Sequence, residues 1–393
     1  MQQRSVSKSP IFNHLLKTVP TFMLLFIAPI GPVPAQIVPP ILTKTESVPP
    51  PPTKNSMASD WLKLWDGEST FGWQVQGNAT IENKQLTLGG ASQTTLTSTS
   101  PFLEFELEIT TRNTDQLGVM IHKKKIPLKF SKFNGEKQTF RITCMNRPEK
   151  GVVQIQELKT DRQEKNAPTE TIELNEKISS AEPIQLRIGE NQKAHILSLR
   201  VHPLNLKPIF NHKDLTGWKI FAGEKYRSQF SVSANGELQV KNGPGDLQTT
   251  GEYGNFVLQL DCQTLGKNLN SGIFFRCNPD LYQQGYEMQI HNGYKEGDRK
   301  KPIDFGTGAI YRRQPARMIV SNDHEWFTMT LIASGNHFAT WVNGYQVTDW
   351  VDNRPAKANP RQGLKLGKGH LSIQGHDPTT NILFRNIRLT SWD

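Results

Sequence analysis

The residues best suited to chemistry alternate with apolar residues along one short segment of the chain. Glu287, Gln289 and His291 occupy every second position there, and Met288 and Ile290 lie between them. Successive side chains of a β-strand point to opposite faces. A strand at this place would therefore put a carboxylate, an amide and an imidazole on one face and bury two apolar side chains on the other. The carboxylate and the imidazole are groups that transfer protons in enzymes.

A second segment, near the C-terminus, repeats this alternation. Ser372, Gln374 and His376 alternate with Leu371 and Ile373. Amide and imidazole groups offer hydrogen-bond donors and acceptors side by side, which suits the hydroxyl groups of sugars. The pattern predicts a carbohydrate-binding face, although a solvent-facing strand of an ordinary sandwich gives the same alternation.

An aromatic ring and a guanidinium group are candidates for the same face. Phe274 and Arg276 are two residues apart in the segment 270–276, so a regular strand would place both on one face. Tyr311, at the end of the segment 307–311, is a third candidate. Stacking on a ring combined with fixed donors suits a sugar ring, whereas Phe274 could equally pack in the core.

Signatures of several other function classes are absent. The segment 363–368 is one residue short of a phosphate-binding loop and lacks the Ser or Thr that follows it. The ten histidines include no His-x-x-x-His pair and the cysteines no Cys-x-x-Cys pair, so neither a metal site nor a cofactor is predicted. Lys and Arg outnumber Asp and Glu by 46 to 36, but apart from Lys123 to Lys125 they are scattered and accompany no nucleic-acid-binding module. We expect no nucleic-acid partner.

An internal repeat organises the chain. Three pairs of segments align without gaps and in the same order: 64–73 with 209–218, 117–121 with 271–275, and 188–197 with 374–383. A repeat of this size indicates two copies of one domain. We place the copies at 60–203 and 204–393, and the second is longer chiefly through residues 282–322.

Both copies have the pattern of antiparallel sheets. Apolar and polar residues alternate in short runs such as 105–109, 256–260 and 326–332, with Gly, Asn, Asp or Pro between the runs. No convincing helical stripe occurs. The expected fold class is therefore all-β, with two tandem β-sandwich domains of the jelly-roll type.

The N-terminal residues have the order of a secretory signal peptide. Basic residues without acids come first, an apolar stretch covers 21–30, and a small-residue site follows at 33–35. We expect a signal peptide over 1–35 with cleavage near Ala35, an exported (periplasmic or extracellular) protein, and a Pro-rich linker over 36–59. A membrane anchor is the alternative, but the apolar stretch has only about half of the ~20 residues that a spanning helix needs. We expect no stable membrane insertion after cleavage.

The cysteine content limits disulfide bonding. The chain has only Cys144, Cys262 and Cys277. An exported protein meets an oxidising compartment, but three thiols form at most one bridge. The sequence leaves open whether Cys262 and Cys277 form it.

Six blocks of the second copy resemble those of a known family. They follow in the order of that family over residues 207–393: Ile209–Asn211 with Asp214–Trp218, Ser271–Arg276, Tyr286–Ile290, Thr307–Tyr311, Trp341–Gly344, and Gln374–His376 with Phe384–Ile387. This part of the chain looks like the 3-keto-disaccharide hydrolase domain, formerly a domain of unknown function, whose fold is similar to that of concanavalin A-like lectins and glucanases. The first copy resembles the family only in its opening block and closing strands, and the segment 286–292 has no recognisable counterpart there. We therefore expect 60–203 to be a degenerate copy.

The resemblance implies cleavage of the glycosidic bond of 3-keto-disaccharides or other 3-keto-glycosides. Laminarinase-type glucanases carry Glu-x-Asp-x-x-Glu on the catalytic strand, whereas this chain keeps Glu287 and has Gln289 and Asn292 at the other two positions. Because a ketone at C3 acidifies the proton on C2, a single base can instead start elimination of the glycosidic oxygen.

The residue roles follow from this expected chemistry. Glu287 or His376 would remove the C2 proton, and the other would protonate the leaving oxygen. Arg276 or Gln289 would donate a hydrogen bond to the C3 oxygen as negative charge develops there. The remaining candidates would contact the sugar: His291, Gln374, Tyr311 and Phe274. A noncatalytic, lectin-like module using the same face is the alternative, and a buried ion pair at Glu287 would favour it.

Overall fold

The computed structural model describes residues 60–392 except 113, 115, 129–136, 159–168, 222 and 224. The expected signal peptide and the expected Pro-rich linker lie outside the described residues. In the described part of the chain, no helix has the length and apolar character needed to cross a membrane.

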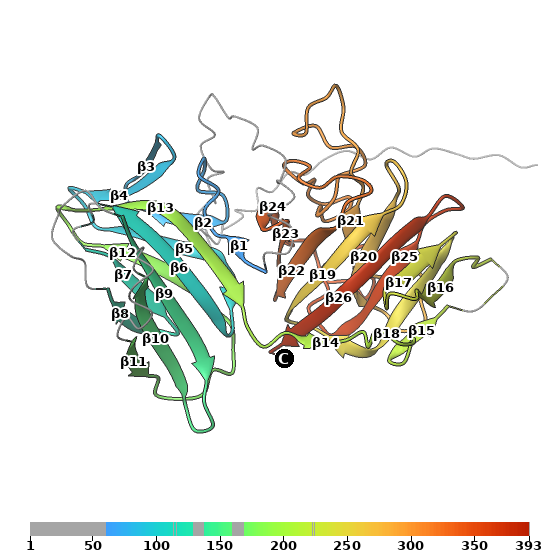
Figure 1. Ribbon diagram of the computed structural model, residues 1–393, viewed down its shortest axis with the longest axis horizontal. Helices are drawn as coiled ribbons and strands as arrows, with labels where there is room; N and C mark the ends of the chain where they lie inside the picture. Colours follow the sequence, from blue (N-terminus) through green and yellow to red (C-terminus); the bar gives the residue numbers. More distant parts are fainter. Residues whose placement is uncertain are drawn as a thin grey trace, which may run out of the picture. The chain divides into compact units, whose positions relative to one another are not determined.

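The regular secondary structure of the described residues is β-strand (Figure 1). The strands of the first half are β1 (Leu62–Lys63), β2 (Trp73–Gln76), β3 (Ala79–Glu82), β4 (Gln85–Gly90), β5 (Thr94–Phe102), β6 (Phe105–Arg112), β7 (Gly118–Ile121), β8 (Lys124–Pro127), β9 (Lys137–Asn146), β10 (Gly151–Leu158), β11 (Thr169–Glu173), β12 (Glu182–Ile188) and β13 (Gln192–Pro203). Those of the second half are β14 (Lys207–Pro208), β15 (Trp218–Ile220), β16 (Gln229–Val232), β17 (Leu238–Lys241), β18 (Gly245–Tyr253), β19 (Phe256–Thr264), β20 (Ser271–Cys277), β21 (Tyr286–Ile290), β22 (Phe327–Ser334), β23 (His337–Val342), β24 (Tyr345–Val351), β25 (Gly369–Gly375) and β26 (Asn381–Ser391). The all-β expectation is confirmed.

Each half of the described chain forms a larger and a smaller sheet. In the first half the orders are β11-β10-β9-β6-β13-β4-β3, with β1 also on β13, and β2-β5-β12-β7-β8. In the second half they are β16-β17-β26-β19-β22-β23-β24, with β14 also on β26, and β15-β18-β25-β20-β21. The two halves thus repeat one arrangement of strands, and the expectation of tandem sandwiches is confirmed.

The repeated opening segments make the same local contacts. The indole Nε1 of Trp218 donates to the carbonyl of Ile209 at 3.0 Å, and the indole Nε1 of Trp73 donates to the carbonyl of Leu64. Both tryptophans are buried. The sequence repeat is therefore also a repeat of structure.

Each sandwich has an apolar core formed by alternate residues of its strands. On β6, Leu107 and Ile109 are buried, and on β19 Leu258 and Leu260 are buried. Removing apolar surface from water contributes about 25 cal/mol per Å² to folding. The inward rows hold the two sheets of each sandwich together.

The three cysteines are buried free thiols. Burial raises the pKa of Cys144 to about 12 and the pKa values of Cys262 and Cys277 well above the ordinary range. Cys262 and Cys277 do not form the bridge that the sequence left open. Since the thiolate is the reactive form of cysteine, these side chains act as small apolar core residues.

Candidate functional site

Two rows of facing residues build a polar face on the smaller sheet of the second sandwich. Strands β18, β25, β20 and β21 are neighbours in that order (Figure 1). The antiparallel registers align the following residues across them: Gln248, Ser372, Phe274 and Glu287 in one row, and Asp246 with Gln374 and Gly272 with Gln289 in the next. All the polar side chains of both rows are buried. A sheet face with this many buried polar groups is unusual and points to a binding site.

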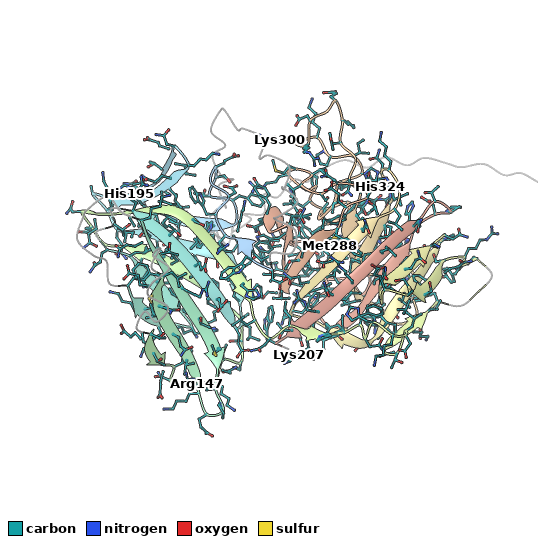
Figure 2. The ribbon with its side chains drawn as sticks, viewed as in Figure 1. Arg147, His195, Lys207, Met288, Lys300 and His324 are labelled. Carbon is teal, nitrogen blue, oxygen red and sulfur yellow. The ribbon has the colours of Figure 1, made fainter. Side chains whose placement is uncertain are left out.

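The opposite face of the same four strands is apolar. Leu247, Ile273, Met288 and Ile373 pair across the strands and are almost fully buried in the core. Figure 2 labels Met288, which separates the two polar residues of β21 along the chain. The period-two pattern of the sequence therefore places the polar and apolar residues of these strands on the faces expected.

A glycine in β20 makes room at the middle of the polar face. A Cβ atom on Gly272 would lie 2.5 Å from Glu287 Oε1, which is closer than atoms pack. Gly272 faces Gln289 on β21. The absence of a side chain at this position lets the carboxyl group of Glu287 lie across the sheet.

Glu287 is 5% exposed and forms an ion pair with Arg361. Its Oε2 accepts a hydrogen bond from Arg361 Nη2 at 2.9 Å. Burial raises the pKa of the Glu287 carboxyl to about 7, although Arg361 lowers it, and the charges of Asp246 and Asp304 act in the same direction as burial. This side chain therefore gains and loses a proton near neutral pH.

Asp246, on β18, is a second buried carboxyl of the polar face. It is 1% exposed; its Oδ2 accepts a hydrogen bond from the backbone nitrogen of Gln283 at 3.2 Å, and its Oδ1 has no partner among the described residues. Burial raises the pKa of Asp246 to about 7, and contacts with Gln283, Ser372 and Arg361 oppose this shift. The sequence analysis did not select Asp246.

The two carboxyls lie on the same polar face and share a charged neighbour. The charge on Asp246 raises the pKa of Glu287, and the charge on Arg361 lowers the pKa values of both. Carboxyls with pKa values near 7 can donate or accept a proton at neutral pH. Arg361 lies on a loop and was also not selected from the sequence.

Two amide oxygens of the polar face are buried without a partner among the described residues. They belong to Gln289 and Gln374. The Gln289 Nε2 donates to the backbone oxygen of Asp304 at 3.1 Å and to its Oδ2 at 2.8 Å. With both amide hydrogens engaged, Gln289 presents only an acceptor, so the expectation that it donates to the C3 oxygen of a sugar is not met. Unpaired buried acceptors suit the hydroxyl groups of a ligand.

Arg276 does not lie on the polar face, which corrects an expectation from the sequence. A register shift between Phe274 and Cys277 interrupts the alternation of β20. The Arg276 side chain is fully buried, with Nε 2.9 Å from the carbonyl of Gly254 and Nη1 2.8 Å from that of Lys365. Since an extra residue in a strand sends the next side chain to the other face, Arg276 ties backbone segments together instead of meeting a ligand.

The two candidate histidines lie just beyond the ends of β21 and β25. His291 is 8% exposed, and its Nδ1 accepts a hydrogen bond from the backbone nitrogen of Gly293 at 3.2 Å. Burial lowers the pKa of His291, so the neutral ring carries its proton on Nε2. His376 is exposed and its Nδ1 lies 2.8 Å from Asp377 Oδ2. The charge of His376 contributes to lowering the pKa of His291, which agrees with both rings lying at the same end of the sheet.

Tyr311 and Phe274 surround the guanidinium of Arg361. The Arg361 guanidinium carbon lies 5.0 Å from the ring centroid of Phe274 and 5.9 Å from that of Tyr311. Phe274 is fully buried, so its ring packs against Arg361 and does not contact a ligand directly. The Tyr311 backbone nitrogen donates to the carbonyl of Glu287 at 2.9 Å.

A cavity of about 250 Å³ adjoins this group. The side chains and loops that matter for its chemistry come from three segments of the second sandwich: Glu287, Tyr311, Arg312, Arg313, Pro360 and Arg361. This volume is below the roughly 300–1,000 Å³ of drug-sized ligand sites. It suits one ring or one charged substituent.

A cluster of three aromatic rings lies near Asp246. The ring centroids of Tyr226 and Tyr282 are 5.0 Å apart, and those of Phe221 and Tyr226 are 5.6 Å apart. The backbone nitrogen of Phe221 donates to the carbonyl of Asp246, and the charges of Asp246 and Glu287 help burial to raise the pKa of Tyr282. These half-buried rings offer a stacking surface that the sequence analysis missed.

The matching face of the first sandwich lacks both carboxyls. Strand β8 takes the place of β21 in the sheet order, so the segment 286–292, which has no recognisable counterpart in the sequence of the first copy, has one in its structure. The registers assign these correspondences: Glu287 to Lys125, Gln289 to Pro127, Phe274 to Met120, Gln374 to Arg187, and Asp246 to Thr95. They also shift the expected alignment of the closing strand by one residue, since Leu186 and not Arg187 takes the place of Ile373.

Comparisons with solved structures return proteins of similar size to the second sandwich. Two structures from Parabacteroides distasonis, both provisionally named glycosyl hydrolases, are 23% and 27% identical. They cover 48% of this chain and 94% and 99% of their own chains, with TM-scores of 0.39 and 0.37. A carbohydrate-binding module of Bacillus subtilis is 15% identical and covers 44% of this chain and 96% of its own, with a TM-score of 0.32.

The comparison with protein families gives a direct assignment for the second sandwich. No curated protein matches the chain. Residues 205–390 match the model of the family described as the 3-keto-alpha-glucoside-1,2-lyase-like domain. The match begins just before β14 and ends within β26, so it takes in every strand of the polar face. Residues 205–390 are therefore similar to the 3-keto-alpha-glucoside-1,2-lyase-like domain family.

Proposed function

We propose that the second sandwich cleaves the glycosidic bond of 3-keto-disaccharides and other 3-keto-glycosides by base-initiated elimination followed by hydration. The observation that carries this proposal is the pair of Glu287 and Asp246, two buried carboxyls with pKa values of about 7 on one polar face. The description of the family, a lyase acting between positions 1 and 2 of a 3-keto-glucoside, supports the same bond.

In the elimination step, Glu287 acts as the base. Its carboxylate removes the proton from C2, and the electron pair left on C2 is stabilised by the C3 ketone and then forms the C1=C2 double bond as the C1–O bond breaks. Asp246 in its protonated form gives its proton to the leaving oxygen. Arg361, hydrogen-bonded to Glu287, favours the ionised form of Glu287, which is why we assign the base role to that residue.

In the hydration step, the two carboxyls reverse their roles. The Asp246 carboxylate accepts a proton from water as the water oxygen bonds to C1, and Glu287 returns its proton to C2. Both groups regain their starting protonation states, and the net result is hydrolysis of the glycosidic bond. The arrangement thus needs only one pair of groups for both steps.

Arg361 is the group that we assign to the C3 oxygen. When Glu287 takes the C2 proton, its negative charge moves onto the sugar, and the guanidinium 2.9 Å from Glu287 then faces the new charge. A fixed donor aimed at charge that develops in the transition state contributes about two to three orders of magnitude in rate. This role replaces the one expected of Arg276 and Gln289.

Sugar contacts are proposed for the groups around the carboxyl pair. Gln289 and Gln374 would accept from hydroxyl groups, and His291 and His376 would bind at the end of the sheet. His376 is also the alternative to Asp246 as the second proton-transfer group. Its exposure and its contact with Asp377 make it the weaker choice.

The rest of the chain has a simpler proposed role. Residues 60–203 are a degenerate copy without activity, because Lys125 and Thr95 occupy the places of the two carboxyls. The protein is exported, with the signal peptide 1–35 removed near Ala35 and residues 36–59 serving as a linker.

A noncatalytic carbohydrate-binding role is the second candidate. The buried ion pair between Glu287 and Arg361 is the specific observation that favours it, because a paired carboxylate also serves to orient a bound sugar. The pKa of about 7 at Glu287 weighs against this role, since a purely structural pair would keep the carboxylate ionised throughout the neutral range.

The test compares a 3-keto-disaccharide with its unoxidised parent as substrates of the mature chain. Wild type should release monosaccharides from the keto compound alone. Glu287→Gln should slow cleavage by about two to four orders of magnitude while binding is nearly unchanged, and Glu296→Gln, which alters an exposed glutamate of the same sandwich, should behave as wild type. If wild type bound both sugars and cleaved neither, the proposal of an enzyme would be wrong and the noncatalytic carbohydrate-binding role would take its place.

A further inference from the structure

The cavity beside Glu287 carries an excess of positive charge. Three arginines line it, Arg312, Arg313 and Arg361, and among its described lining residues Glu287 is the single acid. The pKa of Glu287 is about 7, so this carboxyl supplies less than a full negative charge at neutral pH. The cavity therefore remains cationic when it is free of ligand.

Acids among the described residues balance the charge of these arginines only in part. Asp352 is paired with Arg354 at 2.8 Å, and its charge also raises the pKa of Arg313. Arg313 donates to the backbone carbonyls of Arg312 and Arg361, which are uncharged acceptors. Burial and the charges of Arg354 and Arg361 lower the pKa of Arg313, a sign that these cations repel one another.

The fixed geometry of the arginines suits a planar anion. Arg361 is held by Gln283 and Glu287 and stacks over Phe274. The Arg312 guanidinium lies over the Tyr311 ring at 5.3 Å from its centroid. Guanidinium groups that are already oriented match the two oxygens of a carboxylate better than a flexible ammonium does.

The aromatic cluster and the cavity are linked by one loop. The aromatic cluster adjoins β18 through the contact of Phe221 with Asp246, whereas the cavity adjoins β21 through Glu287. The carbonyl of Gln283, the residue after Tyr282, accepts a hydrogen bond from Arg361 Nε at 3.0 Å. Because Glu287 and Arg361 are assigned to C2 and to the C3 oxygen, the 3-keto unit of a disaccharide lies beside the arginines, and its leaving unit lies toward Asp246 and the aromatic rings.

We infer that the arginine cavity binds a carboxylate group on the 3-keto unit of the substrate, so that the preferred substrates are glycosides of a 3-keto-uronic acid. This inference rests on the proposed function for the cleaved bond but not for the binding of the acid itself. An acidic unit would gain charge-assisted hydrogen bonds that a neutral hexose lacks. Hydrogen bonds of this kind contribute about tenfold or more each to affinity.

The first measurement is binding, by calorimetry, of glucuronic acid and glucose to the mature chain carrying Glu287→Gln, at low and at high salt. Glucuronic acid should bind at least about tenfold more tightly than glucose at low salt, and the difference should shrink as salt is added. Arg312→Gln and Arg313→Gln should each reduce the preference, and Arg313→Lys should retain part of it. Arg187→Gln, which removes an exposed arginine of the first sandwich, should leave it unchanged.

The second measurement is kcat/KM of wild type for two 3-keto-disaccharides that differ only in having a uronic acid or a hexose as the oxidised unit. The acidic substrate should be favoured by about tenfold or more. Equal binding of glucuronic acid and glucose, or equal kcat/KM for two substrates that are both cleaved, would overturn the inference and leave the proposed function in place. Selective binding of glucuronic acid by a protein that cleaves neither substrate would support carboxylate binding in the cavity and overturn the proposed function.

Discussion

Glu287 Oε2 lies 2.9 Å from Arg361 Nη2, and the same carboxyl has a pKa of about 7. An arginine alone would lower the pKa of its partner, so burial outweighs the ion pair here. The contact holds Glu287 in one position without fixing it in the ionised form. A positioned carboxyl that still exchanges protons at neutral pH is what a general base requires.

The rate of cleavage should depend on pH as a bell with both limbs near pH 7. The reaction needs one ionised and one protonated carboxyl, and Glu287 and Asp246 both have pKa values of about 7. Asp246→Asn should lower kcat by about two to four orders of magnitude and remove the alkaline limb, because no acid is then left to titrate. Steady-state kinetics on a 3-keto-disaccharide measures this. A profile that stays flat through neutral pH would show that neither carboxyl takes part.

The free energy of unfolding should fall as pH rises from about 4 to about 7. Burial raises the pKa of Asp246 to about 7 in the folded state, whereas the unfolded chain has the ordinary value near 4. The folded state therefore binds more protons between these values, and stability is lost as they leave. Asp246→Asn should be more stable than wild type by about 2 kcal/mol at pH 8 and about equal at pH 4 in denaturant titrations. Asp280→Asn, at an exposed carboxylate, keeps Asp246 and should differ from wild type by the same amount at pH 4 and pH 8. A gain in stability at pH 8 for this variant as well would remove the explanation.

Gly272→Ala should reduce activity strongly, and Gly118→Ala should not. The new Cβ at 272 would lie 2.5 Å from Glu287 Oε1 and displace that carboxyl, whereas at 118 the nearest atom is the carbonyl oxygen of Arg187 at 3.4 Å. A shift of the base of about 1 Å lowers the rate by about a hundredfold. Parallel measurements of kcat and of thermal stability separate displacement of the base from unfolding. Equal rates for both variants would mean that the position of Glu287 is not critical.

Arg276→Met should destabilise the protein without changing the KM of the folded fraction. The substitution leaves the carbonyls of Gly254, Gly335 and Lys365 without their buried donor. Losing several charged hydrogen bonds of this kind costs about 3 kcal/mol or more. Chemical unfolding and substrate titration at low temperature test the two halves of this statement. A normal unfolding midpoint with a raised KM would indicate that Arg276 contacts the sugar.

The mature exported protein should begin near Gln36. The N-terminal segment has basic, apolar and small-residue zones in the order that export machinery reads. Expression with export in a bacterial host, followed by N-terminal sequencing of the secreted fraction, gives the first residue. Recovery of Met1 or Gln2 at the start of the exported chain would contradict the cleavage.

The alternation of residues along a strand is a local property, and it predicted the polar face of β21 and β25 well. Glu287, Gln289 and Gln374 lie together because each strand is regular where they occur. The sequence analysis assigned Arg276 to the polar face, but a register shift in β20 sends its side chain to the opposite face. No residue type in the sequence marks this register shift. Local patterns therefore predict a face only as far as the strand stays regular.

The residues that the sequence analysis missed come from elements far apart along the chain. Asp246 lies on β18 and Arg361 on a loop after β24, and only the folding of the sheet brings them to Glu287. One signal was available for Asp246, since it alternates with Leu247 just as Glu287 alternates with Met288. No comparable signal exists for Arg361, because a loop has no period that fixes the direction of its side chains.

Gly118 of the first sandwich holds the place that Gly272 holds in the second, yet it has no carboxyl to accommodate. The long side chain of Lys125 approaches a Cβ there only to 3.7 Å. The space at this position therefore belongs to the arrangement of strands that both sandwiches share, and only in the second sandwich does an acid occupy it.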